Sequence, residues 1–150
     1  MKYIFKKSDE DKTVAGSSRI CRIYDGFNKD VYALGQLKTL FGEPLYITEN
    51  LENQFSYCIM ATDENGKTCY LDVYSASTGP AIGGPASARE AANALAAYIR
   101  GAKASDYDYE GYYLDGPCKV KRGIKNGQPY EESEELVLSS KEMRALLQRL

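Results

Sequence analysis

The sequence contains no histidine and no tryptophan, and it has only 4 cysteines and 3 methionines in 150 residues. Without histidine, a Ser–His–Asp triad, a Cys–His dyad and every zinc site that uses an imidazole ligand are excluded. Carboxylate, lysine, tyrosine and cysteine chemistry remains open. However, no pair of such residues is distinguished by its sequence context. We therefore expect a protein that is not an enzyme.

The cysteines, at positions 21, 58, 69 and 118, include no C-x-x-C pair. Such pairs are typical of zinc ribbons and thioredoxin-like redox sites, so neither is indicated. Three of the four lie in expected strands, where a reduced cysteine behaves as a small apolar residue. We expect neither a cofactor nor a metal ion.

The sequence also lacks any run approaching the roughly 20 apolar residues of a membrane helix. Its first residues, Met1-Lys2-Tyr3-Ile4-Phe5, do not open a long apolar segment like that of a secretory signal. We therefore expect a cytoplasmic protein with no membrane partner. A net charge of −2 and a pI of about 5.3 do not indicate the basic patch of a nucleic-acid binder, so we expect no nucleic-acid partner either.

The apolar pattern predicts one α+β domain over residues 1–150, with a mainly antiparallel sheet built from hairpins and about three helices packed on it. Expected strands cover residues 2–6, 19–24, 55–61, 67–75, 119–125 and 128–138. Expected helices cover residues 30–41, 87–100 and 139–150. The first helix has apolar residues at three- and four-residue spacing, and the other two begin with the capping-box pairs Ser87/Glu90 and Ser139/Glu142.

Two Asn-Gly dipeptides predict two-residue type I′ turns, because both central residues of such a turn need positive φ. A turn at 65–66 pairs Glu64 with Lys67 and places Cys58 opposite Val73. A turn at 126–127 gives three pairs of opposite charge, which supports its register. These pairs are Arg122–Glu131, Lys121–Glu132 and Lys119–Glu134.

Residues 77–85 are rich in glycine and proline and are expected to form a tight loop between a strand and a helix. Such a loop can bind an anion through free backbone N–H groups at a helix N-terminus. Against this role, Pro85 and Ala86 stand where a Walker A loop has lysine and serine or threonine. A small anion- or nucleotide-binding module that uses Gly79–Gly84 remains the alternative functional hypothesis.

A segment that mixes carboxylates with tyrosines is the main candidate binding site. Its members are Asp106, Tyr107, Asp108, Tyr109, Glu110, Tyr112, Tyr113 and Asp115. Tyrosines supply large, stiff contact areas at interfaces, and carboxylates attract a basic partner. Two other interpretations stay open. The segment could be an edge strand with inward tyrosines and solvated acids, or the alternating acids could form part of a Ca²⁺ site. Glu49 and Glu52, in a second acidic stretch from 43 to 66, could extend the surface if the fold joins the two zones.

Five short segments carry a resemblance to a known class of proteins. They are LFGEP at 40–44, FSY at 55–57, ATDENGK at 61–67, YL at 70–71 and GPAIGG at 79–84. Together, over roughly residues 30–104, the chain resembles the bacterial immunity proteins of polymorphic toxin systems. The resemblance implies that the chain binds a cognate toxin domain, often a nuclease with a basic cleft, and occludes its active site. It implies no particular site residue and leaves the oligomeric state open.

Overall fold

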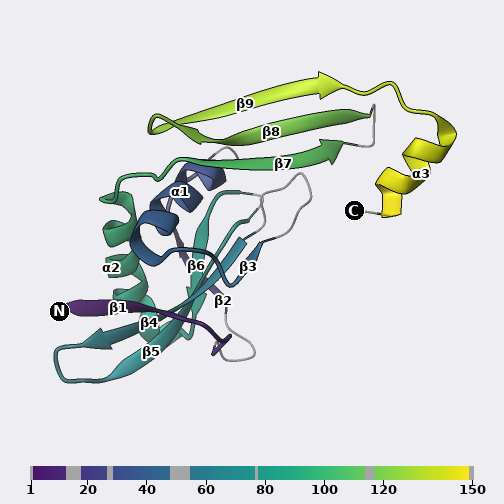
Figure 1. The fold of residues 1–150 in the computed structure, drawn as a ribbon. Helices are drawn as coiled ribbons and strands as arrows, with labels where there is room; N and C mark the ends of the chain where they lie inside the picture. Colours follow the sequence, from purple (N-terminus) through teal and green to yellow (C-terminus); the bar gives the residue numbers. More distant parts are fainter. Residues whose placement is uncertain are drawn as a thin grey trace.

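The computed structural model describes residues 2–12, 18–26, 29–47, 55–76, 78–113 and 117–148 (Figure 1). The elements in chain order are β1 (Tyr3–Ser8), β2 (Ser18–Arg22), α1 (Lys29–Phe41), β3 (Tyr46–Ile47), β4 (Phe55–Asp63), β5 (Thr68–Tyr74), β6 (Ala81–Gly84), the 3₁₀ turn η1 (Ala86–Ala88), α2 (Arg89–Arg100), β7 (Tyr107–Tyr113), β8 (Cys118–Lys125), β9 (Gln128–Glu135) and α3 (Ser140–Gln148). The predicted α+β class and the antiparallel hairpins are confirmed.

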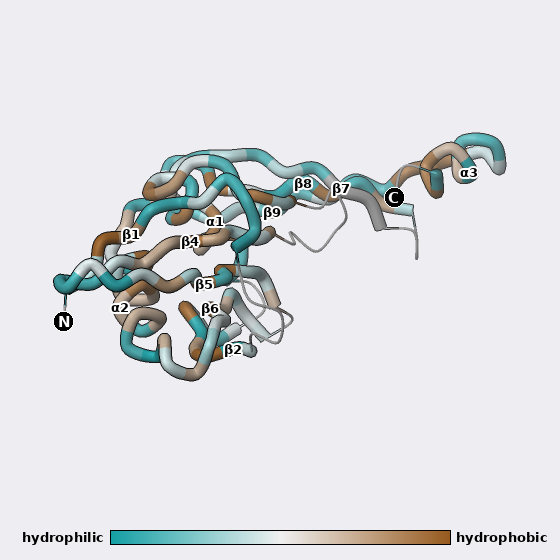
Figure 2. Tube along the Cα trace, turned by 90° about the horizontal axis from the view of Figure 1, so that it is seen from below, coloured by the Kyte–Doolittle hydropathy of each residue, from teal (hydrophilic) through white to brown (hydrophobic). Residues whose placement is uncertain are grey.

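The strands of the described residues form two antiparallel sheets. The central sheet has the order β1-β4-β5-β6-β2, with the short β3 also paired to β4. The second sheet has the order β7-β8-β9, and we call it the projecting sheet because it extends beyond the central sheet in both views of the backbone (Figures 1 and 2). Helix α3 follows β9 and stands apart from the central sheet in both views.

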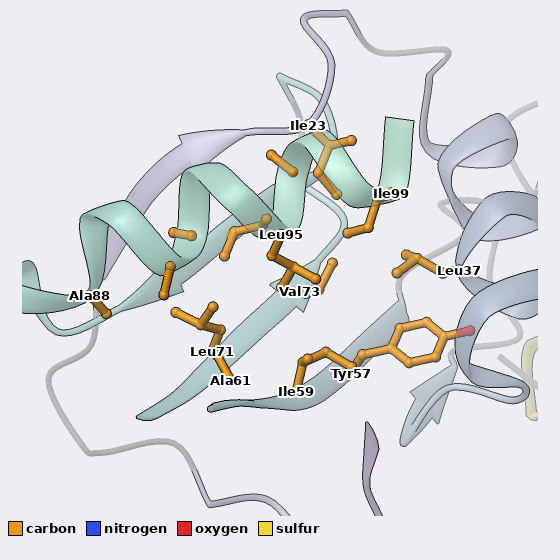
Figure 3. Close-up of a cluster of buried hydrophobic side chains, with 14 of the residues drawn as sticks. Ile23, Leu37, Tyr57, Ile59, Ala61, Leu71, Val73, Ala88, Leu95 and Ile99 are labelled. Carbon is orange, nitrogen blue, oxygen red and sulfur yellow. The ribbon is translucent and has the colours of Figure 1, made fainter. Parts of the chain in front are cut away.

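The main core lies between the inner face of the central sheet and helix α2. Ile59, Leu71 and Val73 point from β4 and β5 toward Leu95 and Ile99 on α2 (Figure 3). All five side chains are fully buried, and small alanines on the buried side of α2 let the helix lie close to the sheet. Burial of each large apolar side chain contributes about 1.5–3 kcal/mol.

Helix α1 is buried on two sides. Leu34 and Leu37 join the main core, whereas Val31 packs with Ala104 and Ile124 beneath the projecting sheet. Gly35 permits this second contact, because a Cβ there would lie 3.0 Å from both the Ala104 Cβ and the Ile124 Cγ1 atoms. Helix α1 therefore connects the central body to the projecting sheet.

The two predicted hairpins have different outcomes. The β8–β9 hairpin has the predicted register, including Lys121 opposite Glu132, and Asn126 and Gly127 both adopt positive φ, at 55° and 76°. The β4–β5 register is displaced by one residue from the prediction, so Cys58 lies opposite Asp72. The physical reason is the Asp63 carboxylate, which accepts hydrogen bonds from the Asn65 and Lys67 amides at 2.9 and 3.0 Å. It thereby makes a three-residue loop in which Gly66 has a φ of 78°.

The glycine-rich segment is not the loop that we predicted. Ala81–Gly84 is strand β6, fully buried and paired with both β5 and β2. Its backbone groups therefore belong to the central sheet rather than to an anion cradle. The predicted Ser87/Glu90 capping box is also wrong, because α2 follows a 3₁₀ turn and its N-cap, Ala88, makes no side-chain cap.

The second predicted capping box is confirmed at the start of α3. The Glu142 amide donates to Ser139 Oγ at 3.2 Å, and the Ser139 amide donates to Glu142 Oε1 at 3.3 Å. This reciprocal pair satisfies two backbone donors that the first helical turn leaves without partners. The cap fixes where the chain turns from β9 into the final helix.

Candidate functional site

The acidic, tyrosine-rich segment forms β7, one edge of the projecting sheet. Successive side chains of a strand point to opposite faces. Tyr107 and Tyr109 consequently share the face that packs on α1, while Asp108 and Glu110 share the face turned to solvent, which we call the outer face. Both carboxylates are exposed, whereas Tyr109 is 8% exposed. The edge-strand interpretation, with inward tyrosines and solvent-facing acids, therefore describes this segment.

The inward tyrosines contact their own chain. The Tyr107 hydroxyl donates to the Val31 carbonyl of α1 at 2.8 Å, and Lys38 Nζ lies 5.2 Å from the Tyr107 ring centroid. Burial raises the pKa of Tyr107 well above its usual value, so the ring keeps its proton. The expectation that Tyr107 and Tyr109 offer contact area to a partner is thus corrected, because the Tyr107 ring fastens the projecting sheet to α1 and the Tyr109 side chain is buried.

Two acids, Asp106 and Glu110, are held by groups of the neighbouring β8–β9 hairpin. Asp106 accepts hydrogen bonds from the Asn126 and Gly127 amides, both at 3.0 Å. Glu110 pairs with Lys119 at 2.8 Å across β7 and β8. The sequence shows no cation between residues 104 and 118, but the adjacent strand supplies one. These acids are therefore held on a sheet scaffold.

The Asp106 hydrogen bonds should respond to pH. Donation from the Gly127 and Asn126 amides lowers the pKa of Asp106 below its ordinary 3.8. The stabilisation is therefore complete above 3.8 and is lost as the pH falls through the lowered value. In NMR spectra, the two amide proton shifts should titrate with a midpoint below 3.8, and Asp106→Asn should abolish that titration. A wild-type midpoint at or above 3.8 would contradict the assignment.

Tyr130 completes the outer face and was not singled out by sequence reasoning. It lies opposite Gly123 in β8, and its hydroxyl donates to Asp108 in β7, so its ring must cross over the glycine. Burial, followed by the hydrogen bond to Asp108 and the nearby carboxylates, raises the pKa of Tyr130 to about 12. A hollow of about 310 Å³ beside this ring is lined mainly by Asp106, Asp108, Lys121, Lys125, Tyr130 and Glu132.

The charges of the projecting sheet are arranged by strand. Seven described carboxylates lie on or beside this sheet, against four described cations. The carboxylates are Asp106, Asp108, Glu110, Glu131, Glu132, Glu134 and Glu135, and the cations are Lys119, Lys121, Arg122 and Lys125. All four cations lie in the middle strand, so both edge strands are acidic. The β9 glutamates are all exposed, and sequence reasoning used three of them only as hairpin partners. The sequence shows these glutamates as the run EESEE, but it does not show that this run lies on an edge strand.

Several predicted site residues cannot be assigned to this surface. Glu49, Glu52 and Asp115 lie outside the described residues. Tyr112 and Tyr113 lie in β7 opposite Lys119 and Cys118, by backbone register. Their contribution to binding, like that of the second acidic zone, stays a prediction.

The central sheet carries a smaller polar cluster on the face opposite its core. The Ser56 hydroxyl donates to Asp72 Oδ1 at 3.0 Å, and burial raises the pKa of Asp72. Cys58, opposite Asp72 in the register, accepts a contact from the Lys12 amide at 3.5 Å, and burial raises the pKa of its thiol. A protonated thiol is a weak nucleophile, so this cluster has no evident activated group. Across the described ranges, no three Cys, Asp or Glu residues are grouped to hold a metal ion.

No family model, curated protein or solved structure matches the chain. Of the helices in the described part of the chain, none combines the length and the apolar character needed to cross a membrane. The geometry of the projecting sheet is therefore the basis for a functional argument.

Proposed function

We propose that this chain is a non-enzymatic binding protein of the immunity type. It inhibits a basic toxin domain by covering that domain's active site with the acidic edges of the projecting sheet. The observation that carries the proposal is the set of exposed carboxylates held on β7 and β9, on a sheet that packs on α1 and extends beyond the central sheet.

The scaffold suits this role because the acids are fixed on strands rather than on a loop. Hydrogen bonds from Tyr107 to α1 and from the 126–127 turn to Asp106 hold the sheet in place. A preorganised charged surface loses little conformational entropy when it binds. The partner's arginines and lysines would therefore meet carboxylates that are already positioned.

Electrostatic attraction makes the strongest contribution during encounter. A surface of one sign raises association rates by about 10- to 1,000-fold, and the effect falls steeply as salt increases. Carboxylates are a good match for the phosphate-binding cleft of a nuclease, because such a cleft presents cations to an anionic substrate. A nuclease toxin is accordingly the partner class that this surface fits best.

The proposal implies that a toxin domain is encoded beside the gene for this chain, and the test uses that domain. We expect the full-length protein to bind it in a 1:1 complex and to inhibit it. Neutralising the β9 glutamates with Glu131→Gln, Glu132→Gln, Glu134→Gln and Glu135→Gln should weaken binding at least tenfold and flatten its salt dependence. Calorimetry and a toxin activity assay measure these effects. Glutamine keeps the side-chain shape, and exposed ion pairs contribute at most about 1 kcal/mol each, so the fold should persist.

A matched control removes the same charge from the central body. Glu10, Asp25, Glu43 and Glu64 are all exposed, and Glu10→Gln, Asp25→Asn, Glu43→Gln and Glu64→Gln together should leave the affinity within about twofold. Equal losses in both variants would show that net charge, not this surface, determines binding. An absence of any complex with the encoded toxin would remove the proposal altogether.

A further inference from the structure

Within the described ranges, no other strand pairs with the outer side of β9. In the β8–β9 hairpin, hydrogen-bonded pairs alternate with pairs that make no such bonds. The Leu136 amide donates to the Pro117 carbonyl at 2.9 Å, which fixes the phase of this alternation. The amide and carbonyl groups of Glu131, Ser133 and Glu135 therefore point away from β8, at the free edge of the sheet.

The position of Pro129 agrees with this alternation of hydrogen-bonded and non-hydrogen-bonded pairs. Proline lacks an amide hydrogen and is tolerated in a sheet where its nitrogen faces away from the neighbouring strand. Pro129 pairs with Ile124, two residues before Glu131, so its nitrogen also faces outward. The stretch with free outward amides thus begins at Glu131, and it presents three donors and three acceptors to solvent.

We propose that this edge of β9 receives an extended, lysine- or arginine-rich segment of the partner as a fourth strand of the projecting sheet. The inference rests on the proposed function and specifies how the partner is held. Main-chain hydrogen bonds to Glu131, Ser133 and Glu135 provide the pairing. The neighbouring glutamates select a basic sequence, because they lie on both faces of the added strand. Addition of a strand to an exposed sheet edge is a common mode of peptide recognition.

Charge excludes a second copy of this chain as the occupant. If two β9 strands paired in antiparallel fashion about Ser133, Glu131 would face Glu135 and Glu132 would face Glu134 of the other copy. Like charges directly opposite each other destabilise a sheet. Charged residues on an edge strand are a general device against edge-to-edge association. The same four side chains favour a cationic strand and repel an identical one.

The first experiment separates backbone pairing from charge. The full chain, labelled with ¹⁵N, is titrated with a capped seven-residue peptide of alternating lysine and threonine. We expect the amides of Glu131, Ser133 and Glu135 to shift and to exchange with solvent more slowly. A glutamate–threonine peptide should not bind. The lysine peptide N-methylated at every residue keeps its charge but has no backbone amide donor at either edge, and it should bind at least tenfold more weakly. Equal binding of the methylated and unmethylated peptides would overturn the inference.

The second experiment uses Ser133→Pro in the full chain, with Ser133→Thr as its control. The Ser133 amide points away from β8, so proline removes an outward donor and places its ring on the docking edge without deleting a β8–β9 hydrogen bond. Unchanged β8 amide spectra check that the hairpin survives. We expect proline to weaken binding to the encoded toxin domain at least tenfold, and threonine to leave it within about twofold.

The two proposals fail in different ways. If the four β9 glutamine substitutions weaken toxin binding but Ser133→Pro does not, the partner recognises the acidic surface without adding a strand. The proposed function then stands and this inference falls. If neither change affects binding to the toxin, both proposals fall.

Discussion

Replacing Gly123 by alanine is expected to destabilise the protein by about 3 kcal/mol or more. Gly123 lies in the middle strand of the projecting sheet, opposite Asp108 and Tyr130. A Cβ atom there would lie 2.8 Å from the Tyr107 carbonyl carbon and would overlap its oxygen. That carbonyl belongs to the paired strand β7, so it can move away only if the β7–β8 pairing is disturbed.

The same substitution should also displace Tyr130. The Tyr130 ring crosses Gly123 to reach Asp108, and an aromatic ring over a strand glycine compensates for the missing side chain. The high pKa of Tyr130, about 12, should therefore fall toward the ordinary tyrosine value in the variant. Absorbance titrations of the wild type, Gly123→Ala and Tyr130→Phe measure this change. The difference between the wild type and Tyr130→Phe identifies the Tyr130 signal, which should move to lower pH in Gly123→Ala.

Gly101→Ala is the matched control for Gly123→Ala. At Gly101 the φ is −81°, and the nearest backbone oxygen would lie 3.6 Å from an added Cβ. Alanine fits there, so we expect a stabilisation of about 0.4–1 kcal/mol. Urea unfolding of both variants measures the difference. Similar free energies of unfolding for the two variants would show that the close approach at Gly123 is relieved without cost.

The β8–β9 hairpin could be predicted in full because its determinants are local. Asn126 and Gly127 are the residues that a type I′ turn requires, and the opposite charges on either side agree with its register. The β4–β5 hairpin has the same dipeptide, yet its register differs by one. There, the side chain of Asp63 competes with the two-residue turn by accepting the Asn65 and Lys67 amides. An Asp two residues before Asn-Gly is the sequence signal that favours the longer loop.

The candidate site was predicted only in part because it depends on contacts distant in sequence. The composition of residues 106–113 gives the alternation of acid and tyrosine, but α1 determines which face is buried. Helix α1 lies more than 60 residues away in the chain, and no local pattern places it beneath β7. The prediction of a loop at the glycine-rich β6 was wrong for a related reason. Gly83 and Gly84 look like loop residues, but they allow close packing against Ser18 and Leu71 inside the central sheet.

Replacing Gln36 by leucine is the second substitution with a large expected effect, a loss of about 2–4 kcal/mol. Gln36 is the buried polar side chain of α1, with 1% exposure. Its Nε2 donates to the Arg100 and Ala102 carbonyls at 3.2 and 2.9 Å, and its Oε1 accepts from the Tyr24 hydroxyl at 2.8 Å. Leucine has a similar volume but takes away the hydrogen-bond partner of all three groups at a buried position.

Comparison of two Gln36 substitutions separates hydrogen bonding from packing. Gln36→Glu retains the acceptor for Tyr24 but replaces the donor amide by a carboxylate that faces two carbonyl oxygens. At pH 7 it should therefore destabilise the protein more than Gln36→Leu, because an unpaired buried charge costs more than an unpaired neutral group. Gln148→Ala, at an exposed position of α3, should change the free energy of unfolding by less than about 0.5 kcal/mol. If Gln36→Leu instead equals Gln148→Ala in urea unfolding, α1 is held by apolar packing alone. In that case the hydrogen bonds from Gln36 to Tyr24 and to the end of α2 contribute little to the free energy of unfolding.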